Sequence, residues 1–162
     1  MTILHSTLFP LGYPLIARYV FTTPGAFSVT APAPPDFAFG ATYIRAGVSA
    51  AGGFRDNAAG WGGGAAFAFA GEACTPGAVY TGQVGDSQHS RPEADDALGD
   101  GWLKRPDSSL LVYGDRGRWN GNPGLAANCT GTIKRDGSAA TANAGGASAG
   151  DDADPYPLGF GG

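Results

Sequence analysis

Apolar and polar residues alternate along several short stretches of this chain, and a period of two is typical of half-buried β-strands. In the stretch FSVTA, which begins at Phe27, apolar residues alternate with a serine and a threonine. The stretches that predict strands are 18–22, 27–31, 37–48, 108–113 and 130–135. The stretch 37–48 is apolar on both faces, so we expect it between two layers. The pattern predicts an all-β fold, a small glycine-rich β-sandwich or jelly-roll-like module with long loops and an extended N-terminal arm.

The tetrapeptide Thr-Pro-Gly-Ala occurs twice, at 23–26 and 75–78, and each copy precedes an alternating stretch. Proline at the second position and glycine at the third are typical of a type II turn. We therefore expect the same kind of hairpin turn at both places.

A glycine-rich stretch at 50–85 organises the chain, with Gly-Trp-Gly-Gly-Gly around Trp61 and an Ala/Phe run that holds Phe67 and Phe69. Glycines this dense do not favour helix or strand. Aromatic residues are also not typical of flexible linkers. We expect these glycines to let backbone segments approach one another closely. The charged stretch 86–107 predicts a long exposed loop, and 114–124 predicts a second glycine loop.

The first 17 residues are apolar and interrupted by prolines, and they lack the basic region that begins a signal peptide, so we do not expect cleavage. They suit an extended arm that docks on another surface, or an edge strand of the same domain; the pattern does not decide. Such an arm would expose apolar side chains unless they were covered. These are Leu8, Phe9, Leu11, Tyr13, Leu15 and Ile16. We expect a docking arm at 1–19 and a glycine-rich β domain at 20–162.

Charged side chains make up only 15% of the 162 residues, and the net charge is −4. Ordinary soluble domains have about 25%. Such a surface is either covered by neighbours in an assembly or kept wet by small polar residues. The negative charge argues against nucleic-acid binding. No apolar run is long enough to predict membrane insertion.

No pattern in the sequence predicts a catalytic, metal or cofactor site. Ser87 and His89 lack a third partner for nucleophilic catalysis. A cluster of acidic residues fits a solvated loop better than a carboxylate pair. These residues are Glu93, Asp95, Asp96 and Asp100. The glycines match no nucleotide-binding motif, and the few cysteines and histidines lack the spacing of a zinc site.

Cys74 and Cys129 are the only cysteines. They could form one disulfide or remain free buried thiols, and the spacing does not decide.

The tryptophans lie beside glycines, where an aromatic ring with polar neighbours could stack on a carbohydrate. The alternative, favoured for Trp61, is that each ring covers a glycine-rich face of the core. Trp119 is the best binding candidate, because it is flanked by polar and cationic residues. The candidate surface consists of Trp119, Arg116, Arg118, Asn120 and Trp102.

Several segments resemble the glycine-rich domain of tailed-phage tail fibre and receptor-binding proteins. They are FTTPGAFSVTAP from Phe21, the run AAGWGGGAA, TPGAVYTGQVGDS from Thr75, DSSLLVYGDRGRWNGNPGLAANCTG from Asp107, and the closing GGASAGDDADPYPLGFGG. The resemblance covers roughly residues 20–162, although this chain has a thinner central glycine block and a longer charged loop than the family. It implies glycine segments that pack as polyglycine II helices, with three residues per turn. By analogy, 54–60, 86–107 and 115–123 would be the outward loops.

The resemblance implies a surface-exposed virion protein, produced in the host cytoplasm, that serves as a tail fibre or spike module for host attachment. We expect it to be non-enzymatic and homo-oligomeric, with a trimer favoured. Its other partners would be virion proteins and a host-surface polysaccharide or protein. The alternatives are a capsid decoration or vertex-spike protein without a receptor role and, less favoured, a polysaccharide-degrading domain that uses acidic residues in 86–107.

Overall fold

The computed structural model describes residues 19–32, 42–53, 62–86, 97–141 and 146. The docking-arm residues, Trp61 and the acidic residues at 93–96 lie outside these ranges, so the expectations for them stay predictions. Within the described residues no helix is long and apolar enough to cross a membrane.

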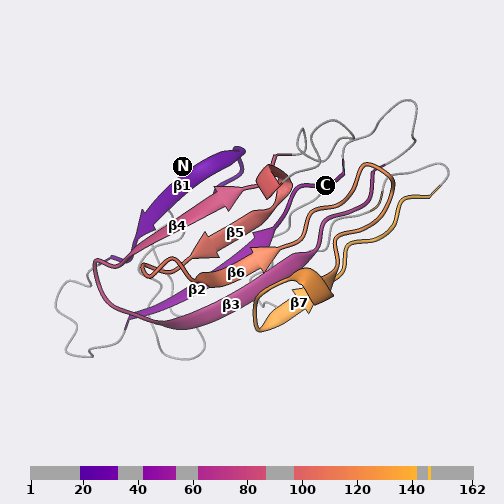
Figure 1. The fold of residues 1–162 in the computed structure, drawn as a ribbon. Coiled ribbons are helices and arrows are strands. Elements are labelled where there is room, and N and C mark those ends of the chain that lie inside the picture. Colours follow the sequence, from indigo (N-terminus) through magenta and orange to yellow (C-terminus); the bar gives the residue numbers. More distant parts are fainter. Residues whose placement is uncertain (1–18, 33–41, 54–61, 87–96, 142–145, 147–162) are drawn as a thin grey trace.

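The described residues form a small all-β sandwich of two antiparallel sheets (Figure 1). One sheet has the order β1-β4-β5-β6, and the other has the order β2-β3-β7. The strands of the first sheet are β1 (Gly25–Thr30), β4 (Val79–Val84), β5 (Gly101–Lys104) and β6 (Leu110–Gly114). Those of the second are β2 (Thr42–Ser49), β3 (Phe67–Cys74) and β7 (Ile133–Arg135). Two short 3-10 helices, η2 (Ala97–Gly99) and η3 (Ala126–Asn128), lie between strands.

The core lies between the sheets and combines small side chains from one sheet with larger ones from the other. Ala68 and Ala70 of β3 face Tyr80, Leu103 and Val112 of the four-stranded sheet, and all five are buried. Inward side chains alternate with outward ones along β1 and β4, which confirms the period of two at 27–31. The stretch 108–113 contains β6, but its consecutive residues Leu111 and Val112 are both buried, beside an irregularity in the pairing with β5. The predicted all-β sandwich is therefore confirmed.

Two of the predicted strands differ from the structure. The stretch 19–22 is not a strand, because its aromatic rings pack on β1 instead: the centroids of Phe21 and Phe27 lie 3.9 Å apart. The described part of 37–48 is β2, but only one of its faces is buried. Tyr43 on the other face is 61% exposed, so β2 is not covered on both sides.

The Thr-Pro-Gly-Ala turns are not hairpins. At 75–78 the turn itself forms, since Gly77 has φ +81° and the Ala78 N–H donates to the Thr75 carbonyl at 3.0 Å. However, it links β3 of one sheet to β4 of the other. Gly77 and Ala78 of the turn form backbone hydrogen bonds with Ala31, directly after β1. The chain therefore passes from one sheet to the other at this turn.

The charged region 86–107 is not one exposed loop. Its described part contains η2 and all of β5, and Leu103 is buried in the core. Outward Trp102 and Lys104 alternate with inward Gly101 and Leu103, so a short period-two pattern lies within a charged context.

Beyond the strands, extended segments with little strand structure pack into what we call the glycine layer, residues 50–53, 62–66, 114–118, 121–125 and 136–141 with Gly146. In Figure 1 these segments continue past the end of β6 toward the upper right. The segment 62–66 lies at the centre of the layer and is buried throughout.

Candidate functional site

The central segment of the glycine layer bonds to neighbours on several sides, whereas a strand in a sheet has at most two neighbours. The Gly63 N–H donates to the Arg118 carbonyl at 2.8 Å, and the Gly63 carbonyl accepts from Gly53 at 2.7 Å. Backbone bonds of 62–64 reach the stretches around Gly53, Arg118, Gly124, Ser138 and Gly146. The central segment is therefore bonded in more directions than a sheet strand would be, whereas a polyglycine II helix with three residues per turn stays a prediction.

Glycine is required in this layer because the backbones touch. A Cβ on Gly63 would lie closer to the Asn122 carbonyl oxygen than the 3.0 Å that real Cβ atoms keep, and 2.9 Å from the Pro123 nitrogen. Gly117 and Gly124 meet neighbouring carbonyls in the same way. The glycine-rich stretch therefore allows the close approach that the sequence predicted.

The layer holds a tight turn, residues 118–122, which we call the tip. The Arg118 N–H donates to the Asn122 carbonyl at 2.8 Å, and Gly121 has φ +84°. The Asn120 side-chain oxygen accepts from the Asn122 N–H at 3.2 Å, so the asparagine fixes its own turn. Asn120 is exposed and Trp119 is half-buried. The expected outward loop at 115–123 is thus reduced to this tip, since residues 115–118 belong to the packed layer.

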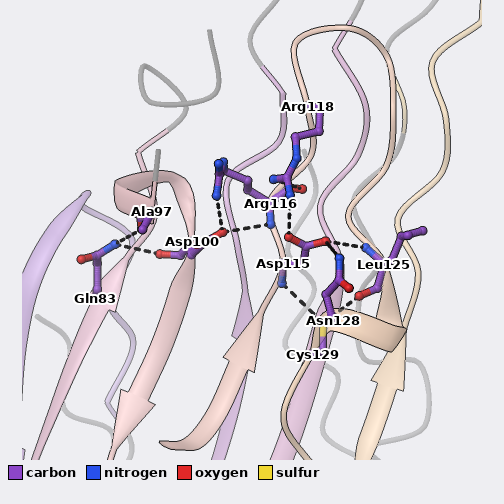
Figure 2. Close-up of polar contacts among 9 residues, drawn as sticks. All are labelled: Gln83, Ala97, Asp100, Asp115, Arg116, Arg118, Leu125, Asn128 and Cys129. Atoms are coloured by element: carbon purple, nitrogen blue, oxygen red, sulfur yellow. Dashed lines mark hydrogen bonds and ion pairs between the residues drawn. The ribbon is translucent and has the colours of Figure 1, made fainter. Parts of the chain in front are cut away.

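A buried carboxylate, Asp115, ties the layer to the segment that carries η3 (Figure 2). Its side chain is satisfied on both oxygens. Arg118 Nη2 lies 3.1 Å from Oδ1, while the Leu125 N–H and Asn128 Nδ2 donate to Oδ2 at 3.0 and 2.8 Å. With Asp115 only 3% exposed, this network replaces the water that the charge has lost.

A second buried carboxylate, Asp100, pairs with Arg116 at the start of β5 (Figure 2). Arg116 Nη1 lies 3.0 Å from Oδ1, and the two side chains are only 12% and 6% exposed. The Gln83 side chain donates to the Asp100 and Ala97 carbonyls, each at 3.0 Å. Burial and the nearby Asp100 charge raise the pKa of Tyr113, whose hydroxyl bonds to this carboxylate.

These networks change the roles of the predicted binding residues. The structure brings Arg116, Arg118, Trp119 and Asn120 into one segment, but both arginines hold buried aspartates inside the protein. Trp102 lies apart on β5, with the Lys104 ammonium 4.5 Å from its ring centroid. Of the predicted surface, Trp119 and Asn120 remain candidates at the tip, and Trp102 remains one on the sheet.

The two cysteines are free thiols, so the disulfide considered from the sequence is not formed. Cys129 is buried beside Asp115, where its sulfur accepts from the Asp115 N–H and lies 3.4 Å from the Leu125 carbonyl. Cys74 ends β3, near Glu72 and Tyr80. Burial is the main cause that raises the pKa of both thiols, and the negative charge of Glu72 adds to it at Cys74.

A polar cluster at the edge of the core joins the two sheets. Arg105 Nε lies 2.7 Å from a Glu72 carboxylate oxygen, and the Tyr80 hydroxyl donates to the other oxygen at 3.4 Å. Burial, followed by the charges of Cys74 and Glu72, raises the pKa of Tyr80 to about 12. A raised tyrosine pKa keeps the hydroxyl protonated, which makes this group a hydrogen-bond donor and not a base.

The described residues hold no group of three or more histidine, cysteine, aspartate or glutamate side chains that could bind a metal. Of the acidic residues weighed for catalysis, only Asp100 is described, and its ion pair with Arg116 occupies it. Sequence reasoning missed Asp115 and Gln83 as structural anchors, because Asp115 is a polar residue in a glycine-rich apparent loop and Gln83 is a polar residue in an alternating stretch, where a solvent-facing side chain is expected.

Comparisons of the chain with models of known protein families, with curated protein sequences and with solved structures found no match.

Proposed function

We propose that this protein is a phage virion structural protein, a surface-exposed tail fibre or spike module that attaches the particle to its host. The resemblance to tail fibre and receptor-binding proteins motivates this proposal. Two of the resembling segments contain β1 and β4, and the glycine run contains the centre of the glycine layer. We further propose that the protein is not an enzyme and that it forms a homo-oligomer, with a trimer favoured. Its partners would include other virion proteins.

One observation carries the proposal: a firm backbone layer holds a short turn at its end. The layer is fixed by backbone hydrogen bonds in several directions and by the Asp115 network. A turn on such a support loses little conformational entropy when it binds, because it is already ordered. Trp119 and Asn120 at the tip combine an aromatic face with an amide, the residue types that are common in recognition surfaces.

The experiment is a binding assay on cells of the bacterial host of the encoding phage, with fluorescently labelled protein. We expect the wild type to bind saturably and Trp119→Ala to bind at least about tenfold more weakly, a loss of about 1.4 kcal/mol. Tyr43→Ala is the matched control, because it removes an exposed aromatic ring from β2 in the three-stranded sheet and leaves the tip unchanged. Arg118 is unsuitable for this test, since its loss would uncover the Asp115 charge.

Labelling of intact particles with antibodies to the protein separates the alternatives. Tail labelling together with tip-dependent cell binding supports the proposal. Head labelling without cell binding would favour a capsid decoration protein. Loss of viscosity of a host polysaccharide in the presence of the protein would overturn the non-enzymatic assignment.

A further inference from the structure

The four-stranded sheet turns one face away from the core, and strand pairing identifies the residues on it. Val29 and Tyr80 are paired and packed with the core, as are Leu103 and Val112, so the residues between them in each strand point outward. One row of outward residues crosses the whole sheet and continues through the bridge to Thr130. It consists of Ala26, Gln83, Trp102, Tyr113 and Thr130. A second row consists of Ser28, Thr81, Lys104 and Leu110.

This outer face is nearly without charge and mixes polar and apolar groups. The four strands contain one charged residue, Lys104, and the other outward positions carry hydroxyl, amide, aromatic and apolar groups, which include the exposed side chains of Val79 and Leu110. Ser28, Thr81 and Thr130 are exposed. The nearby Asp100 carboxylate is neutralised by Arg116 and buried, so it does not oppose the lysine charge at the surface. On a chain with net charge −4, this face is locally positive.

The aromatic and polar groups of the face are held in place. Trp102 and Tyr113 lie directly opposite each other on neighbouring strands, and the Tyr113 hydroxyl is anchored on Asp100. Figure 2 shows the Gln83 amide nitrogen turned toward two backbone carbonyls, with its oxygen pointing away from them. The Lys104 ammonium lies over the Trp102 ring. A partly exposed contact of this kind is weak, so an anionic ligand could pair with the ammonium and uncover the ring.

We infer that the outer face of the β1-β4-β5-β6 sheet binds a polysaccharide that carries carboxylate groups, such as a uronic acid polymer. The apolar face of a sugar ring would stack on Trp102 beside Tyr113, a sugar carboxylate would pair with Lys104, and sugar hydroxyls would bond to Thr81, Gln83 and Thr130. The charge selects an acidic polymer over a neutral one. The inference relies on the proposed attachment role for its biological setting, but the face lies on the strands and can be tested separately from the tip.

The test is isothermal titration calorimetry of the full chain with polygalacturonate and alginate oligosaccharides, with dextran of similar length as the neutral polymer. We expect binding of at least one acidic oligosaccharide, at least tenfold weaker binding of dextran, and weaker acidic binding at higher salt. Trp102→Ala should lower the affinity at least tenfold. Lys104→Gln, at a half-buried position that points away from the core, should lower the affinity for the acidic polymer about tenfold and leave the affinity for dextran unaffected. Tyr43→Ala and Trp119→Ala should bind the acidic polymer as the wild type does.

Three results would overturn the inference: no binding of either acidic polymer, equal binding of dextran, or wild-type affinity in both Trp102→Ala and Lys104→Gln. Self-association measured by analytical ultracentrifugation is a further outcome. If the wild type self-associates, Trp102→Ala does not, and neither binds sugar, the face binds a second copy of the chain instead. If Trp119→Ala alone abolishes cell attachment while the acidic polymer still binds, the tip proposal stands apart from the sheet site. If the polymer binds but the protein does not attach to cells, the attachment role fails and the sheet site remains.

Discussion

Replacing Gly63 by alanine tests whether close backbone contact in the glycine layer stabilises this protein. The added methyl group would overlap the carbonyl of Asn122 and the Pro123 nitrogen, which are backbone atoms that cannot rotate away. Relief requires the segments to separate. That movement would lengthen the two bonds that Gly63 makes, to Arg118 and from Gly53.

The size of the effect follows from these two costs. Overpacking in a close-packed interior costs about 1–3 kcal/mol. Each backbone hydrogen bond contributes about 1 kcal/mol net, so two bonds add about 2 kcal/mol. We expect a loss of about 3–5 kcal/mol in the free energy of unfolding. At about 2–4 °C per kcal/mol for a chain of this size, the melting temperature should fall by roughly 6–20 °C. Thermal and urea denaturation followed by circular dichroism measure both quantities.

Gly77→Ala is the control, because Gly77 lies in an open turn with nothing within 4 Å of an added Cβ. Its φ of +81° makes alanine unfavourable for conformational reasons alone, by about 1–2 kcal/mol. The reasoning is refuted if Gly63→Ala destabilises the protein no more than Gly77→Ala. That result would mean that the layer separates readily and does not hold the tip firmly.

Three further predictions concern buried polar groups. Asp115→Asn should lower the free energy of unfolding by about 2–4 kcal/mol in urea denaturation near pH 7, because it leaves the partly buried Arg118 without its charged partner. Asp107→Asn, at the surface, is the control and should lower it far less. Tyr80 should contribute stability that is fully present below pH 10, its ordinary pKa, and lost as the pH rises toward its folded pKa of about 12; the free energy of unfolding measured against pH should fall less steeply there for Tyr80→Phe. Cys74 should react with a thiol reagent in the native protein before Cys129, which should react only on unfolding, and equal rates for the two would contradict the burial of Cys129.

The sequence predicted the fold class because alternation of inward and outward residues is kept in strands that pack on the core, such as β1 and β4. It did not predict the pairing, since the turn at 75–78 has the local chemistry of a hairpin but forms backbone hydrogen bonds with Ala31, which follows β1. Non-local bonds of this kind leave no trace in a four-residue motif. β5 was missed for a related reason: its four residues lie in a charged context that resembles a loop.

The candidate site was only partly predictable, and the arginines show why. Flanking cations beside Trp119 suggested a binding surface, but the residues that occupy those cations are Asp100, which is distant in sequence, and Asp115, which looked like part of a solvated loop. Composition gives the charges and not their partners. The outer face of the sheet was equally hidden, because its residues come from four strands and only the pairing places them in rows.

The glycine layer and the buried ion pairs depend on one another. Segments without side chains can approach until their backbones bond, but they offer almost no apolar area to bury, so the hydrophobic effect holds them weakly. The Asp115 network supplies directional bonds where the layer meets the segment that carries η3, and Arg116 does the same where it meets β5. An apolar clamp would need bulky side chains, for which the close approach at Gly117 and Gly124 leaves no room. Buried, paired charges at the margins therefore keep this side-chain-poor layer in one register. They also explain why neither Arg116 nor Arg118 is left to meet a ligand.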